Sequence, residues 1–132
     1  MIQEEKQLLL IDLCGRLPYG VICKLSAKDA DVSITEKLDL CGLEHFIFGT
    51  MDVLPYLRPM SSMTEEEKEY IKNRWCYNDW DIDGPSSLWR EKIDVEDAEG
   101  IIDYFNEHHL DYRALIPMGL ALEASEGMYK TE

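Results

Sequence analysis

The chain has 132 residues, of which 45% are hydrophobic and 30% are charged, and its formal net charge at pH 7 is −14. This composition is typical of a folded globular domain rather than a disordered chain, and the length predicts a single domain over residues 1–132. A strongly acidic surface is repelled by phosphate backbones and by anionic lipid heads, so the charge argues against direct binding to nucleic acid or to a membrane.

The negative charge is concentrated in the second half of the chain. Residues 1–60 hold six Lys or Arg and nine Asp or Glu, whereas residues 61–132 hold seven and eighteen. The net charge is therefore −3 in the first part and −11 in the second. Such a surface favours a basic protein as partner, although the need for solubility also accounts for it.

The first elements in chain order predict a helix followed by a small sheet. Residues 3–15 carry apolar side chains around more than half of the helix circumference, which is typical of a helix with two neighbours or an interface. Residues 21–25, 32–40 and 43–49 are rich in β-branched, alternating or aromatic residues and predict three strands. We expect an antiparallel meander of about three strands, with the first helix packed against it.

A proline-bounded stretch lies in the middle of the chain. Pro55 and Pro59 fix φ and restrict the residues before them, so residues 55–59 are expected to be a rigid connector rather than a helix or a central strand. Thr64 with Glu67 three residues later forms a capping-box pattern, which predicts a helix over residues 65–76.

The second half predicts acidic helices. Asp94 is a suitable N-cap for a helix over residues 95–108, and residues 111–116 predict a further helical turn. Residues 120–122 fit either a strand or a helix, and residues 125–132 are expected to be a frayed tail. The predicted fold class is therefore α+β: an N-terminal helix, a small antiparallel sheet of about three strands, then acidic C-terminal helices.

Five stretches together resemble a known protein family. They are the segments Leu8 to Cys14, Arg16 to Val21, Leu57 to Glu67, His109 to Arg113 and Gly119 to Ala124. They are similar to a family of short uncharacterised proteins from Bacteroides-type gut bacteria and from the phages and mobile elements of those bacteria. The resemblance implies a phage-related setting. It implies no activity, cofactor or catalytic residue.

The cysteines and the N-terminus indicate a cytoplasmic protein. The four cysteines stand at positions 14, 23, 41 and 76, with no Cys-x-x-Cys pair and no histidine at zinc-finger spacing. Charged residues near the N-terminus, and the lack of an apolar run long enough to cross a bilayer, argue against a signal peptide and a membrane span. We therefore expect reduced, mostly buried thiols.

The titratable side chains give little support for catalysis. Cys41 and His45 lie on either side of a glycine in a predicted strand, so their side chains are not expected to meet. The adjacent His108 and His109 cannot easily chelate one ion from a helix, and one of them is expected to end that helix. A pair between Asp111 and Arg113 is expected to be a surface or packing ion pair. An enzyme is the less favoured class.

One segment matches half of a calcium-binding loop. Asp79, Asp81, Asp83 and Gly84 reproduce the opening of an EF-hand loop, but Arg90 replaces the bidentate glutamate at its last position. We expect an acidic, solvated loop and no cofactor. Calcium binding through the three aspartates remains the alternative.

The aromatic residues give the leading functional hypothesis. Six residues of the types that dominate protein interfaces lie in two nearby segments: Tyr56, Arg58, Trp75, Tyr77, Trp80 and Trp89. They predict a binding face, unless the aromatics fold back to complete the core. We therefore interpret the chain as a non-catalytic cytoplasmic accessory protein that contacts another protein. An acidic mimic of nucleic acid, which would occupy the basic groove of a DNA-binding protein or nuclease, is the alternative.

Overall fold

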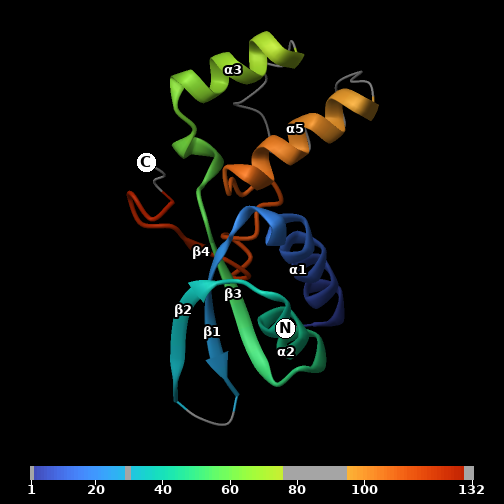
Figure 1. Ribbon diagram of the computed structural model, residues 1–132, viewed down its shortest axis with the longest axis vertical. Helices are drawn as coiled ribbons and strands as arrows, with labels where there is room; N and C mark the ends of the chain where they lie inside the picture. Colours follow the sequence, from blue (N-terminus) through green and yellow to red (C-terminus); the bar gives the residue numbers. More distant parts are fainter. Residues whose placement is uncertain (1, 29–30, 76–94, 130–132) are drawn as a thin grey trace.

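The computed structural model describes residues 2–28, 31–75 and 95–129, and it has the predicted α+β architecture (Figure 1). Helices α1 (Gln3–Arg16) and α2 (Leu40–Phe48) lie on the same side of the sheet. Helices α3 (Glu65–Trp75) and α5 (Val95–Glu107) lie beyond the end of the sheet at which β3 finishes. The ranges of α1, α3 and α5 agree closely with the predicted helices.

The sheet has four strands in the order β2-β1-β3-β4. These strands are β1 (Ile22–Ala27), β2 (Ser33–Lys37), β3 (Met51–Leu57) and β4 (Leu122–Glu123). The predicted meander is wrong in its strand order, because β1 rather than β2 is central: β1 pairs antiparallel with both β2 and β3, whereas β4 adds to β3 in parallel. The sheet is therefore mixed, with one strand more than predicted.

The prediction of a strand over residues 43–49 was wrong, because this segment belongs to α2. The Asp39 carboxylate accepts the Gly42 amide at 2.8 Å and so caps the helix, and Gly49 ends it in the left-handed conformation. Leu43 and Phe46, three residues apart, are both buried. The apolar residues thus follow the helical period rather than the alternation of a strand.

The prediction that residues 55–59 form a connector was also wrong for its first part, because β3 extends through Pro55 to Leu57. The Ala27 amide donates to Val32 on the β2 side, so the odd-numbered residues of β1 form their hydrogen bonds with β2. Pro55 lies opposite the odd-numbered Cys23, in a pair that exchanges no hydrogen bonds. The missing proline N–H therefore removes no bond between β1 and β3.

Two hydrophobic clusters form the core. The larger one lies between the sheet and the helices α1 and α2, and includes Leu9, Leu13, Cys23, Leu25, Phe46, Val53 and Leu57. The smaller one lies where α3 and α5 meet, and includes Met63, Ile71, Ile101, Phe105, Leu110 and Tyr112. We call residues 2–57 the sheet lobe and residues 58–75 with 95–109 the helical lobe.

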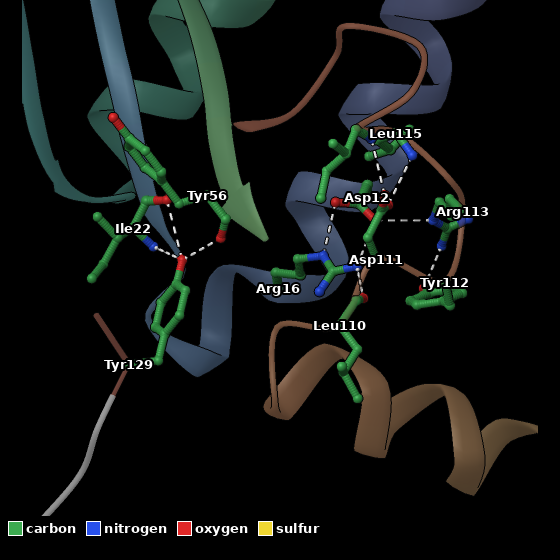
Figure 2. A network of polar contacts seen from close by, with 11 residues as sticks. Asp12, Arg16, Ile22, Tyr56, Leu110, Asp111, Tyr112, Arg113, Leu115 and Tyr129 are labelled. Carbon is green, nitrogen blue, oxygen red and sulfur yellow. Dashed lines mark hydrogen bonds and ion pairs between the residues drawn. The ribbon is translucent and has the colours of Figure 1, made fainter. Parts of the chain in front are cut away.

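The segment after β4 is fixed to the sheet, so the expectation of a frayed tail is wrong for residues 125–129. The Tyr129 hydroxyl accepts the Ile22 amide at 2.8 Å and donates to the Tyr56 carbonyl at 2.6 Å. Figure 2 shows the ring reaching the ends of β1 and β3. The hydroxyl satisfies backbone groups of two neighbouring strands, which the composition of the tail does not reveal.

Candidate interaction site

A buried ion pair on α1 joins the sheet lobe to the segment that follows α5. Arg16 Nε donates to Asp12 Oδ2 at 2.8 Å, and both side chains are fully buried. Arg16 Nη2 also donates to the Leu110 carbonyl at 2.7 Å, and Arg113 Nε contacts Asp12 Oδ1 at 3.1 Å. Figure 2 shows the Asp12 carboxylate between the two guanidinium groups. The negative charge of Asp12 compensates the buried positive charge of Arg16, as a buried ion pair requires.

The expected pair between Asp111 and Arg113 does not form. The Asp111 carboxylate instead accepts the amides of Leu115 at 2.8 Å and Ile116 at 2.9 Å, while Arg113 turns to Asp12. Burial raises the pKa of Asp111, although these two amide bonds and the nearby Arg16 oppose the rise. The two residues that were expected to pair therefore fix two different parts of the fold.

The helical lobe starts from a clamp between Arg58 and Glu67. Arg58 Nη1 and Nη2 donate to the Glu67 carboxylate at 2.9 and 2.7 Å, and Arg58 Nη2 also reaches the Ser62 carbonyl at 3.2 Å. The predicted capping box is confirmed, because the Glu67 carboxylate accepts the Thr64 amide while the Thr64 hydroxyl accepts the Glu67 amide. Burial alone would raise the pKa of Glu67, but the bonds from Arg58 and Thr64 lower it to about 2.

An aromatic row links α3 to the end of α5. The rings of Tyr70 and Tyr104 stack with centroids 5.2 Å apart, and the Tyr104 ring lies 4.2 Å from that of His108. His108 Nδ1 is 3.6 Å from the Glu67 carboxylate. Burial raises the pKa of Tyr104 to about 12, with a smaller contribution from the charge of Glu67. Tyr70 remains half exposed, so one aromatic surface of the row faces solvent.

His109 occupies the junction between the lobes. Its φ is +59°, which is uncommon outside glycine, and its ring stacks on Tyr129 with centroids 3.7 Å apart. Burial lowers the pKa of His109 to about 4, and the positive charge of Arg16 adds to the effect. The imidazole is therefore neutral at physiological pH. The helix α5 ends before it, at Glu107, so a cationic His109 is not what ends the helix.

A groove of about 800 Å³ opens beside the clamp. One wall is formed by residues between Arg58 and Glu67, and the other by residues 123–129. The groove contains one guanidinium, which is already paired with Glu67, together with the carboxylates of Glu123 and Glu126. Its charge is therefore negative, like that of the adjacent helices.

Acidic side chains line one exposed face of α5 between Glu99 and Glu107. Glu99, Asp103 and Glu107 are all exposed and follow one another at intervals of four residues, which places them on one face of the helix. The thirteen residues of α5 contain no Lys or Arg. In contrast, α3 carries Lys68 beside Glu65, and two further basic residues in its last turn. The spacing of the α5 carboxylates is visible in the sequence, but it was not recognised as a separate site there.

The structure describes two of the six residues expected at the binding face. Tyr56 is half-buried, with its carbonyl bonded to Tyr129, and Arg58 is engaged in the clamp with Glu67. The side chains of the other four, Trp75, Tyr77, Trp80 and Trp89, lie outside the described residues, as do Asp79, Asp81 and Asp83 of the expected calcium loop. The described part of the site is thus the clamp, the aromatic row and the acidic helices.

The cysteines are less buried than predicted. Of the three described, only Cys23 is buried, and burial raises its pKa to about 12; Cys14 and Cys41 are exposed, and none of the three forms a disulfide. Cys41 and His45 lie one turn apart on α2 rather than in a strand. His45 Nδ1 is 2.7 Å from the Thr50 hydroxyl, so the ring is already engaged with a neighbour.

The described residues contain no group of three or more His, Cys, Asp or Glu arranged to hold a metal ion. Over the same residues, no helix combines the length and apolar character needed to cross a membrane. Comparison with family models, curated proteins and solved structures produced no match to this chain. The site must therefore be interpreted from its own chemistry.

Proposed function

We propose that the protein is a non-catalytic interaction module of the cytoplasm, and that its acidic helices bind a basic region of another protein. The observation that carries this proposal is the row formed by Glu99, Asp103 and Glu107. Like charges at intervals of four residues destabilise a helix by roughly 0.2–0.5 kcal/mol per pair. A solvated helix face normally interleaves charges of both signs, as α3 does. Positive charges on a basic partner would attract the three carboxylates and offset their mutual repulsion.

The surroundings of the row support a protein as the partner. The half-exposed ring of Tyr70 is the type of residue that anchors interfaces, and the groove beside Arg58 and Glu67 adds further carboxylates. The resemblance to proteins of gut bacteria and their phages agrees with a partner from the host cell. The capping box and the clamp keep the start of α3 rigid, which reduces the entropic cost of binding.

The experiment compares the native protein with the triple variant Glu99→Gln, Asp103→Asn, Glu107→Gln. Each immobilised protein is incubated with host lysate, and retained proteins are identified at low and high salt. We expect the native protein to retain a basic protein that the triple variant loses. The matched control is Glu4→Gln, Glu36→Gln, Glu44→Gln, which removes the same charge from exposed positions in the sheet lobe. Equal retention by the two triple variants would contradict the proposal.

The alternative of a nucleic-acid mimic has one specific observation in its favour. Carboxylates four residues apart on a helix are separated by about 6 Å along its axis, so α5 presents a regular row of negative charges. If the partner normally binds DNA through the same surface, duplex DNA will displace it from the immobilised protein. A partner that stays bound in excess DNA at low salt would instead indicate a surface that is separate from any nucleic-acid groove.

A further inference from the structure

The two edges of the sheet differ in how they are protected. The edge strand β4 has only two residues, and the segment that follows it folds back so that Tyr129 bonds to β1 and β3. The edge strand β2 has five residues, all with exposed side chains, and contains no proline. In Figure 1 no described element lies beyond β2. Natural sheets usually shield such an edge, because its free backbone groups can pair with another strand.

The pairing between β1 and β2 determines which backbone groups of β2 face outward. The Ala27 amide donates to the Val32 carbonyl and the Leu38 amide donates to the Val21 carbonyl. The even-numbered residues of this segment therefore bond to β1. The amides and carbonyls of Ser33, Thr35 and Lys37 consequently point away from β1, toward the open edge.

We propose that β2 pairs antiparallel with β2 of a second copy of this chain, about a two-fold axis that passes beside Ile34. This register pairs Ser33 with Thr35 of the other copy, and both belong to the outward-facing set. It places Asp31 opposite Lys37 of the other copy, and the symmetry repeats this ion pair. Ile34, which is 48% exposed, meets its own counterpart at the axis. The two sheets then form one continuous sheet.

Charge favours this register over the neighbouring one in which the axis passes beside Thr35. If the axis passes beside Thr35, the outward-facing residues Ser33, Thr35 and Lys37 still pair with one another. This register places Asp31 opposite Asp39 of the other copy, and like charges directly opposite each other destabilise a strand pair. The overall net charge of −14 opposes association of two copies. Most of that charge belongs to residues 61–132, and the acidic helices lie beyond the end of β3, away from β2 (Figure 1).

The dimer is expected to be weak and reversible. One strand pair of this length buries less than the roughly 1,200 Å² of a stable, specific interface. Screening of the repulsion between the acidic halves favours association at moderate salt. This inference depends on the sheet alone and does not depend on the proposed partner of α3 and α5.

The test is sedimentation equilibrium over a wide concentration range with the complete protein. We expect a monomer–dimer equilibrium that Thr35→Pro shifts to monomer, because the proline removes an outward-facing amide without removing a bond to β1. Thr35→Val keeps that amide and is expected to retain dimerisation. Circular dichroism checks that each variant is folded.

A charge exchange tests the register independently. Lys37→Glu places two acidic residues opposite each other and is expected to weaken the dimer at least several-fold. The double variant Asp31→Lys, Lys37→Glu restores opposite charges and is expected to recover association. A protein that stays monomeric at every concentration would overturn the proposal. A dimer that is unaffected by both Thr35→Pro and Lys37→Glu would do the same, because it would use another surface.

Discussion

The sheet lobe and the helical lobe use ion pairs in opposite ways. In the sheet lobe, Asp12 and Arg16 are fully buried and occupy positions inside the core. In the helical lobe, Arg58 and Glu67 lie at the rim of a groove and remain partly exposed. A buried charge requires its partner, whereas a rim pair retains access to water. Ion pairs between Arg and a carboxylate therefore stabilise the core in the sheet lobe, whereas in the helical lobe such a pair forms part of an exposed surface.

Removal of Asp12 is expected to lower the free energy of unfolding more than any other substitution proposed below. In Asp12→Ala, Arg16 keeps the Leu110 carbonyl and the Tyr112 ring as neighbours but loses its carboxylate, and so becomes an uncompensated buried charge. We expect a loss of about 3–5 kcal/mol in the free energy of unfolding, measured with urea. Asp103→Ala, at an exposed position of α5, is the control and is expected to change stability by less than about 0.5 kcal/mol. Similar losses in the two variants would refute the distinction between buried and exposed charge.

The free energy of unfolding is expected to fall with decreasing pH in two different ranges. One range is set by His109 at the junction between the lobes, and the other by Glu67 in the helical lobe. The pKa of His109 is lowered to about 4, so its contribution to stability is complete above 6.5 and falls as the pH decreases from 6.5 to 4. The pKa of Glu67 is lowered to about 2, so its contribution is complete above 4.5 and falls as the pH decreases from 4.5 to 2. Each loss is on the order of 2–3 kcal/mol.

Two variants assign these windows to their residues. His109→Asn, which tolerates a positive φ, is expected to flatten the decrease between pH 6.5 and 4. Glu67→Gln is expected to flatten the decrease between pH 4.5 and 2. The free energy of unfolding is measured by urea titration across the pH range. If neither variant changes the slope in its window, the assignment is wrong.

Tyr129→Phe tests whether the segment after β4 belongs to the sheet lobe. The variant keeps the ring beside His109 but leaves the Ile22 amide and the Tyr56 carbonyl without the hydroxyl. We expect a loss of about 1–3 kcal/mol, together with faster hydrogen exchange at the Ile22 amide. Tyr19→Phe removes the hydroxyl of an exposed residue and serves as the control. Unchanged exchange at Ile22 would show that the hydroxyl is dispensable.

Calcium is expected to have the smallest effect. The segment with Asp79, Asp81 and Asp83 lacks the terminal bidentate glutamate of an EF-hand, so millimolar calcium should change neither the melting temperature nor the tryptophan fluorescence. Magnesium at the same concentration controls for ionic strength. A calcium-specific rise in melting temperature would restore the calcium-binding alternative and place a metal between the two acidic helices in the sequence.

Local signals predicted α1, α3 and α5, but neither α2 nor the third strand. The capping box of Thr64 and Glu67 and the apolar spacing in residues 95–108 depend on neighbouring residues, so they are visible in the sequence. Asp39 is an equally local cap signal for α2, but the aromatic and β-branched composition of residues 43–49 is typical of a strand. The prediction around Pro55 was wrong for another reason. Whether a strand tolerates a proline depends on whether that position bonds to the neighbouring strand, and only the pairing with β1 defines this.

The candidate site was predicted only in part, because its contacts connect distant residues. Arg58 was identified from its residue type, but its partner Glu67 was interpreted only as a helix cap. Asp12 lies within the apolar run of the first helix, and its partner Arg113 is 101 residues away. Composition shows that the second half is acidic. It does not show that Glu99, Asp103 and Glu107 lie on one exposed face of α5.

The long separation of these partners also has a consequence for synthesis of the chain. Arg16 bonds to a carbonyl 94 residues later, and Ile22 bonds to a side chain 107 residues later. While the ribosome is still making the acidic helices, α1 has left the tunnel with a charged pair that still lacks its closing partners. The polar contacts around α1 and the start of β1 can therefore be completed only after residues 110 and 129 have been synthesised, so these contacts form late even though most of the core residues around α1 are made early.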